Sequence, residues 1–206
     1  MAPRVLLLDM EGVLNASEPF SRLLELDHGI TLAMTRDFFR GPFVDCNIGR
    51  ADLMEEIAPY LPDWGWRGTV GDFVDYWFHR DLVPNEPLLA RVRQLRVQGV
   101  ACWLATDQER YRLAHLLALP AFTGQFDGVL ASCELGYQKK VPGFWAATLQ
   151  RLSPASPSEM LFVDDSEPNV LAARAAGLRA EVYTGLASLE GVLQGTHPVS
   201  PLPPGE

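Results

Sequence analysis

The chain has 206 residues, 48% of them hydrophobic, which is enough to bury a full core in one domain with a modest insertion. A net charge of −9 leaves no basic stripe for a phosphate backbone, so a nucleic-acid polymer is not expected as a partner. The apolar runs are too short for a signal peptide or a membrane span, and three scattered cysteines are typical of the reducing cytoplasm, where we expect the protein to be located.

The first predicted element is a buried strand at residues 5–8, because its hydrophobicity is continuous, as in strands covered on both faces. The following interval, residues 15–85, contains helical patterns such as 51–61 and 72–78, but no convincing strand. Prolines and glycines interrupt these patterns. We therefore expect a small α-helical cap domain at residues 15–85, inserted into the fold after the first strand.

Strands and helices alternate in the second half of the chain. Further apolar runs predict strands at 100–105, 129–131 and 160–163, and spacings of three and four apolar residues predict helices at 87–98, 109–119, 143–152 and 169–176. Such alternation is typical of an α/β fold with a Rossmann-like parallel sheet. We expect residues 1–14 and 86–195 to form this core, and the proline-rich tail, 196–206, to be loosely attached.

Acidic side chains stand directly after several predicted strands. In an open parallel sheet, ligands bind outside the carboxyl ends of the strands, where these residues would meet. Taken alone, each acid is explained better as a helix cap or turn former. Together, however, neighbouring carboxylates repel one another unless a cation lies among them, and Mg²⁺ is the hard cation that oxygen ligands favour. The candidates are Asp9, Glu11, Asp107, Asp164 and Asp165.

Two further residues suit a phosphoryl group. Thr106 ends a predicted strand with a hydroxyl donor, and Lys139 follows another strand by a short loop. Lys139 and Lys140 are the only lysines in a chain that otherwise uses arginine. Although a lysine pair in a loop is usually a solvated surface feature, a compact ammonium beside a carboxylate is hard to replace by arginine. We therefore predict a functional role for Lys139 and a surface position for Lys140.

Four segments in this order resemble one known family. They are LLLDMEGVL (6–14), WLATDQ (103–108), SCELGYQKKVPGFW (132–145) and LFVDDSEPNVLAARAAGL (161–178). With these motifs the chain resembles the haloacid dehalogenase superfamily, in the branch with a helical cap after the first strand. Within that branch it is similar to glucose-1-phosphatase-like members and to the N-terminal phosphatase domain of soluble epoxide hydrolases.

The resemblance implies a Mg²⁺-dependent phosphohydrolase acting on a small phosphorylated metabolite. Asp9 would be the nucleophile that carries an aspartyl-phosphate, and Glu11 would act as general acid and base. Mg²⁺ would be held by the Asp9 carboxylate, the Glu11 backbone carbonyl and Asp165, with Asp164 ligating directly or through water. Thr106, the backbone at Asp107 and Lys139 would hold the transferring group.

The motifs depart from the family pattern at three positions. Glu11 replaces the more frequent aspartate, Asp107 stands where asparagine is frequent, and Lys140 stands where proline usually follows the motif lysine. Three alternatives to a phosphatase stay open: a phosphomutase with the same intermediate, a haloacid dehalogenase, and a binding or regulatory protein with weakened catalysis. The Asp164-Asp165 pair argues against dehalogenation, which needs no metal in this family.

The cap carries aromatic residues and charges of less certain role. The aromatic residues at helical spacing are expected to form the cap core rather than a substrate pocket; they are Trp64, Trp66, Phe73, Tyr76, Trp77 and Phe78. Arg40 and Arg50 are the cap cations to consider for substrate contact. The four histidines show no metal-ligand spacing.

Overall fold

The computed structural model describes residues 3–195, so the predicted tail at 196–206 lies outside the described residues. Within them a parallel sheet of five strands has the order β3-β2-β1-β4-β5. The strands are β1 (Val5–Leu8), β2 (Ala101–Thr106), β3 (Gly128–Ala131), β4 (Met160–Asp164) and β5 (Arg179–Val182). The predicted α/β class with a parallel sheet is confirmed.

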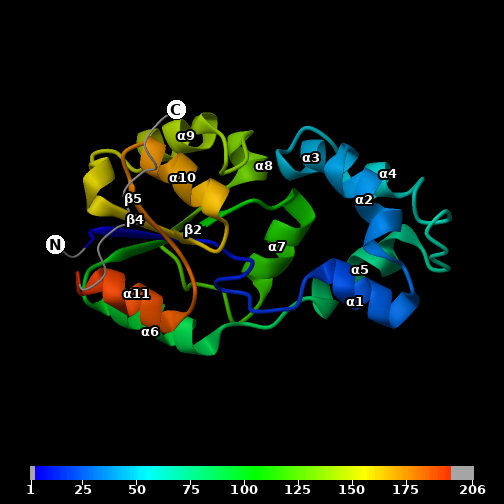
Figure 1. Ribbon diagram of the computed structural model, residues 1–206, viewed down its shortest axis with the longest axis horizontal. Coiled ribbons are helices and arrows are strands. Elements are labelled where there is room, and N and C mark those ends of the chain that lie inside the picture. The colour runs from blue at the N-terminus through cyan, green and yellow to red at the C-terminus, as the bar shows by residue number, and fades with distance from the viewer. Residues whose placement is uncertain (1–2, 196–206) are drawn as a thin grey trace.

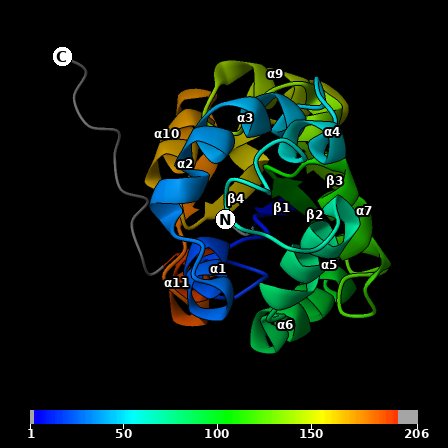
Figure 2. The ribbon, with the colours of Figure 1, turned by 90° about the vertical axis from the view of Figure 1, so that its right-hand side faces the viewer.

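Helices cover both faces of the sheet, as Figures 1 and 2 show. Leu6 and Leu8 of β1 pack with the helices of one face, and Val5 and Leu7 with those of the other, because alternate side chains of a strand point to opposite faces. The first face is covered by α6 (Glu86–Val97), α7 (Arg110–Ala118) and α11 (Leu186–Leu193), and the second by α9 (Pro142–Arg151) and α10 (Glu167–Ala175).

Several elements of the core were not predicted. Strand β5 has only four residues, two of them charged, and therefore lacks the apolar run of the other strands. Helix α11 has a largely apolar sequence, LASLEGVL, without the polar face that reveals an amphipathic helix. Two short elements, α8 (Ser132–Leu135) and the 3₁₀-helix η1 (Pro157–Glu159), are below the length at which periodicity is informative.

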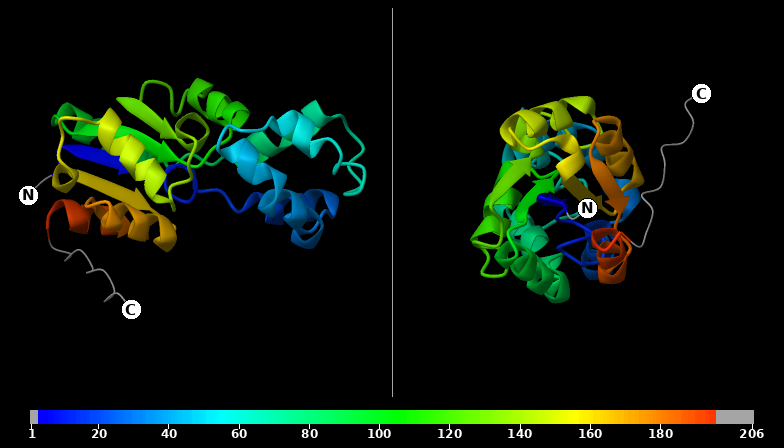
Figure 3. Two further views of the ribbon diagram at one scale, coloured as in Figure 1. Left: turned by 90° about the horizontal axis from the view of Figure 1, so that it is seen from above. Right: turned by 90° about the vertical axis from the view of Figure 1, so that its left-hand side faces the viewer.

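The inserted segment folds into helices only. They are α1 (Phe20–His28), α2 (Leu32–Arg40), α3 (Pro42–Asn47), α4 (Leu53–Ile57) and α5 (Val70–Arg80), and Figure 3 shows them as a lobe beyond one end of the sheet. The lobe has a hydrophobic cluster of its own, in which Trp64, Phe73, Trp77 and Phe78 are buried. Trp66 and Tyr76 pack against it half-buried. The expectation that the aromatics build the cap core is thus confirmed.

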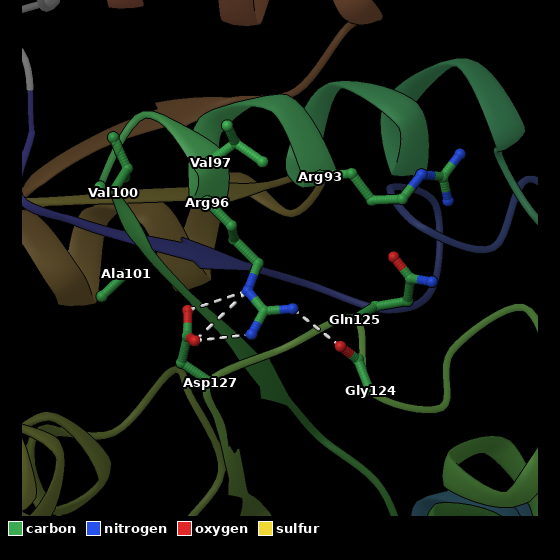
Figure 4. A pocket seen from close by; sticks show the side chains of 9 residues that line it. Arg93, Arg96, Val97, Val100, Ala101, Gly124, Gln125 and Asp127 are labelled. Atoms are coloured by element: carbon green, nitrogen blue, oxygen red, sulfur yellow. Dashed lines mark hydrogen bonds and ion pairs between the residues drawn. The ribbon is translucent and has the colours of Figure 1, made fainter.

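One cavity lies away from the predicted site. Its volume is about 660 Å³, and its lining includes Arg96, Ala101 at the start of β2, and Asp127. Figure 4 shows the Arg96 guanidinium bound to Asp127 and to the carbonyl of Gly124, so its charge is already neutralised there. This cavity faces the amino ends of the strands, opposite to the edge where ligands of parallel sheets bind.

None of the helices within residues 3–195 combines the length and the apolar character needed to cross a bilayer.

Candidate active site

The carboxyl ends of the central strands bring the predicted polar residues together. Strand β1 pairs with β2 on one side and β4 on the other, and Leu8 is in register with both Leu104 and Val163. Asp9 therefore leaves the sheet between Thr106, at the end of β2, and Asp164, at the end of β4. All three residues are buried, with at most 5% of the surface of each residue exposed.

Lys139 reaches into this group from the loop between α8 and α9. Its Nζ lies 2.5 Å from Asp9 Oδ1 and 2.7 Å from Asp164 Oδ2, and only 1% of the residue is exposed. Its backbone N–H donates to Asp107 Oδ1 (2.9 Å), and its carbonyl accepts from the indole of Trp145 (2.6 Å). The Asp107 side chain thus contacts the Lys139 backbone. Lys140, in contrast, is exposed, as predicted.

The electrostatics of the group follow from its burial. Burial raises the pKa of Asp9, and Asp164 adds to this effect, while Lys139 opposes it. Burial also disfavours the charged form of Lys139, but Asp9, Asp164 and Asp107 more than offset it and raise the Lys139 pKa above its ordinary value. The ammonium is therefore a fixed positive charge at the floor of the site.

Asp164 is held by several protein donors besides Lys139. Its Oδ1 accepts from the backbone N–H of Ser166 (2.7 Å) and from Asn169 Nδ2 (3.2 Å), and its Oδ2 also accepts from Asn169 Nδ2 (3.1 Å). Both oxygens therefore have partners. These hydrogen bonds hold the Asp164 carboxylate in place against Lys139. The next residue, Asp165, is exposed.

Asp9, Asp164 and Asp165 form a cluster that suits a hard cation. One carboxylate oxygen from each lies within 4.8 Å of the others. Gly12, with φ of 73°, makes this possible, because a Cβ at that position would lie 2.2 Å from Asp165 Oδ2. Burial and Asp164 both raise the pKa of Asp165, as expected where like charges meet. An all-oxygen donor set of this kind fits Mg²⁺.

Thr106 presents an unsatisfied hydroxyl beside this cluster. Its Oγ1 is buried and has no hydrogen-bond partner among the residues that the structure describes. A buried hydroxyl without a partner is destabilising by about 1–3 kcal/mol. A ligand oxygen at this strand end would satisfy it.

Glu11 is oriented by three side chains. Its Oε2 accepts from Asn15 Nδ2 (2.7 Å), and its Oε1 accepts from Gln108 Nε2 (3.0 Å) and from Arg112 Nη2 (3.0 Å). Asn15 also donates to the carbonyl of Asp81 and accepts from the backbone N–H of Val83, both at 2.7 Å. Glu11 is therefore connected directly to the outgoing segment that joins the core to the cap, and through Asn15 to the returning one.

Arg112 completes this network from α7. Only 2% of its side chain is exposed, and it contacts Asp81 Oδ1 at 2.7 Å as well as Glu11. Burial raises the pKa of Asp81 to about 6, although Arg112 acts in the opposite direction. Arg112 was not singled out from the sequence. A signal was present, because Arg112 shares the buried face of its helix with Leu113 and Leu116, where an unpaired cation would be costly.

A cavity of about 370 Å³ lies between this site and the cap. Glu11, Gly12 and Asp165 line it from the core, and residues of α1, α3 and α5 line it from the cap. The two cap arginines considered from the sequence, Arg40 and Arg50, are exposed and are absent from the lining. The cavity therefore joins the carboxylate cluster to the cap without either of them.

Two curated relatives share part of the chain. The sesquiterpene phosphatase astK of Aspergillus oryzae is 32% identical over 97 residues, which are 47% of this chain and 49% of that protein. Bifunctional epoxide hydrolase 2 of Rattus norvegicus is 30% identical over 129 residues, covering 58% of this chain and 23% of the rat protein. The matches thus span about half of the first relative and a quarter of the second.

Solved structures resemble the fold over nearly its whole length. A HAD-like family hydrolase of Porphyromonas gingivalis has a TM-score of 0.78 at 21% identity, covering 94% of this chain and 99% of that one. A HAD family enzyme of Bacteroides thetaiotaomicron, solved with magnesium and inorganic phosphate, has a TM-score of 0.76 at 20% identity over 91% and 98% of the two chains. L-2-haloacid dehalogenase of Xanthobacter autotrophicus has a TM-score of 0.66 at 19% identity, covering 97% of this chain and 85% of that one. At these identities the likeness concerns the fold alone.

The family itself is established by the sequence. Residues 3–177 match the haloacid dehalogenase-like hydrolases, and this range includes the motif residues from Asp9 to Asp165 as well as the helical insertion. The fold and its solved neighbours agree with that match. The chain therefore belongs to the haloacid dehalogenase-like hydrolase family.

Proposed function

We propose that this hydrolase is a Mg²⁺-dependent phosphomonoesterase with Asp9 as its nucleophile. The observation that carries the proposal is the cluster of Asp9, Asp164 and Asp165 within 4.8 Å, placed against the buried ammonium of Lys139. Carboxylates outnumber cations here, so a phosphate dianion is accepted only when further positive charge is supplied. The similarity to a sesquiterpene phosphatase and the magnesium and phosphate in the Bacteroides structure support this assignment.

Asp9 and Asp165 are the carboxylates best placed to ligate the cation, together with the backbone carbonyl of Glu11. Asp164 lies within the same cluster, but its oxygens already accept hydrogen bonds from the protein. Bound Mg²⁺ would supply charge stabilisation for the transferring phosphoryl group. We assign direct ligation to Asp9 and Asp165, and to Asp164 mainly the support of Lys139.

The chain's own residues provide the two displacement steps. In the first, a carboxylate oxygen of Asp9 forms a bond to phosphorus, the ester P–O bond breaks, and Glu11 gives a proton to the departing alcohol oxygen. In the second, water attacks phosphorus, Glu11 takes its proton, and the bond to Asp9 breaks, which releases inorganic phosphate. Lys139 neutralises charge on the transferring oxygens, and the Thr106 hydroxyl donates to one of them.

The test measures release of inorganic phosphate from an aryl phosphate in the presence of Mg²⁺. The wild type is expected to turn over, and Asp9→Asn is expected to be inactive while retaining the fold by circular dichroism. Asp63→Asn, an exposed carboxylate of the cap, is the matched control and keeps full activity. An acid-quenched reaction should yield a phosphorylated peptide containing Asp9, detected by mass spectrometry.

Three outcomes would contradict the proposal. Isomerisation of a phosphorylated sugar without phosphate release would identify a phosphomutase. Halide release from a 2-haloacid without Mg²⁺ would identify a dehalogenase. No turnover of a panel of phosphate esters by wild type would leave a binding or regulatory protein.

A further inference from the structure

The cavity between the cap and the core has two chemically different ends. At the core end lie Glu11 and Asp165, next to the proposed position of the phosphate. At the cap end it is lined by Phe20 of α1, Phe43 of α3 and Trp77 of α5. A phosphate ester bound with its phosphorus near Asp9 would direct its organic part toward these rings.

The three rings form a continuous aromatic wall. Phe20 and Trp77 are stacked, with ring centroids 5.0 Å apart and an angle of 18° between the planes. Phe43 lies against Trp77 at 5.7 Å. The indole N–H of Trp77 donates to Asp81 Oδ2 (3.2 Å), which fixes the ring and occupies its polar atom. Phe20 and Phe43 are half-buried, so part of each ring faces the cavity.

The charges of the lining oppose a second anionic group. Glu18, Asp81 and Asp107 line the cavity in addition to the two carboxylates at the core end. Arg112 is the single cationic side chain in the lining formed by the described residues. It is already committed to Glu11 (3.0 Å) and Asp81 (2.7 Å). A second phosphate or a carboxylate on the substrate would therefore meet like charge without a compensating cation.

Each uncharged polar side chain of the lining already has at least one hydrogen-bond partner in the protein. Gln108 donates to Glu11, and Ser17 Oγ accepts from Asn15 Nδ2 (3.3 Å). Asn47 Oδ1 accepts from Ser132 Oγ (3.1 Å) and from Gln138 Nε2 (3.3 Å). Hydroxyl-rich organic groups bind where polar side chains are available to pair with them, because each unpaired buried hydroxyl is unfavourable.

We propose that the physiological substrate is the phosphate monoester of an uncharged, hydrophobic alcohol, whose hydrocarbon part packs on Phe20, Phe43 and Trp77. This inference rests on the proposed phosphomonoesterase function and names its substrate class. Burying one large apolar side chain's worth of surface contributes about 1.5–3 kcal/mol, which corresponds to roughly 10- to 100-fold in kcat/KM. The aromatic wall thus selects the ester by its organic part.

The experiment compares esters that share the phosphate and differ in the organic part. Octyl phosphate and naphthyl phosphate are the hydrophobic probes, and glycerol phosphate and fructose bisphosphate are the hydrophilic ones. We expect kcat/KM for the hydrophobic probes to exceed that for glycerol phosphate by about 10- to 100-fold, mainly through KM. Fructose bisphosphate should be the poorest substrate.

Variants of the wall connect this preference to the rings. Phe43→Ala should lower kcat/KM for octyl phosphate about tenfold and leave that for glycerol phosphate within about twofold. Phe43→Arg adds a cation to the cap end and should raise the relative rate on fructose bisphosphate. Tyr60→Ala is the matched control, since Tyr60 is a half-buried aromatic of the same cap cluster that contacts Phe38 and Trp64 but does not line the cavity. In Tyr60→Ala, the ratio of kcat/KM for octyl phosphate to that for glycerol phosphate should equal the wild-type ratio.

The outcomes separate this inference from the function on which it rests. If glycerol phosphate or the bisphosphate is cleaved as well as octyl phosphate, the substrate class is wrong and the phosphatase assignment stands. The substrate class is also wrong if Phe43→Ala lowers kcat/KM equally for all esters. It is likewise wrong if Tyr60→Ala changes the preference between octyl phosphate and glycerol phosphate as much as Phe43→Ala does. If no ester is hydrolysed by wild type, the proposed function fails and this inference fails with it.

Discussion

Lys139 Nζ lies 2.5 Å from Asp9 Oδ1, although both residues are almost completely buried. Replacing Lys139 by Met leaves Asp9 and Asp164 without their shared cation, and breaking a buried ion pair in this way destabilises a protein by about 3–5 kcal/mol. Lys139→Arg keeps the charge but introduces a planar group of different reach. We expect Lys139→Arg to lower kcat by at least about a hundredfold, as measured by phosphate release.

Lys140 provides the comparison for this prediction. Lys140→Arg and Lys140→Met change an exposed neighbour in the same loop and should leave kcat and the urea midpoint unchanged. Wild-type activity in Lys139→Arg would show that the position of the ammonium is unimportant.

Gly12 allows the close approach of Asp165, and this leads to a prediction about Mg²⁺. A Cβ at residue 12 would lie 2.2 Å from Asp165 Oδ2, so Gly12→Ala should displace the carboxylate and abolish the rise in thermal midpoint caused by Mg²⁺. Gly29→Ala is the matched control, with a φ of 70° and no atom within 4 Å of the added Cβ. Both variants lose about 1–2 kcal/mol through backbone strain. Only Gly29→Ala should keep the Mg²⁺-induced shift, and its loss in both variants would contradict the assignment.

Arg112 connects Glu11 with Asp81, and its removal should affect both stability and turnover. Arg112→Met leaves the buried Asp81 beside an apolar side chain, which should destabilise the fold by about 3–5 kcal/mol, and it removes one donor that orients Glu11. Arg110→Met, two positions away on the same helix, removes an exposed pair with Asp52 and should change the unfolding free energy by less than about 1 kcal/mol. Denaturant unfolding and kcat are measured on both. Equal effects of the two substitutions would show that Arg112 has no special role.

At the other end of the sheet, Asp127 should make the stability of the fold depend on pH. Hydrogen bonds from Arg96 and from the backbone N–H of Cys102 hold the pKa of Asp127 below its ordinary value. The unfolded chain therefore takes up this proton first as pH falls, so the contribution of Asp127 is present at neutral pH and is lost as pH falls through the folded pKa. Asp127→Asn should be less stable than wild type at pH about 7, and the difference should shrink toward pH about 3. Asp63→Asn, an exposed control, should show no such dependence.

The residues at strand ends could be predicted because two simple physical rules locate them. Continuous apolar runs identify buried strands, and a parallel sheet brings the carboxyl ends of its strands to one edge. Asp9, Thr106 and Asp164 were found in this way, and Lys139 was found because the chain uses lysine at only two positions. The structure places all four within one buried group.

The residues that orient Glu11 could not be found by the same rules. Asn15 contacts Asp81 and Val83, which are 66 and 68 positions away, and no local pattern reports a contact at that separation. Trp77 shows another limit of periodicity. Its spacing correctly indicated the cap core, yet the same ring also lines the cavity, because a small helical lobe is thin enough for one aromatic side chain to do both.

The contacts of Asn15 have a mechanical consequence. The cap is joined to the core by two linkers, and this one side chain bonds to the returning linker at Asp81 and Val83 and to the carboxylate of Glu11. A swing of the cap that moves the returning linker must therefore either carry Asn15 away from Glu11 or break the bonds of Asn15 to Asp81 and Val83. In the proposed mechanism, in which Glu11 transfers the proton, the orientation of its carboxylate therefore depends on the position of the cap.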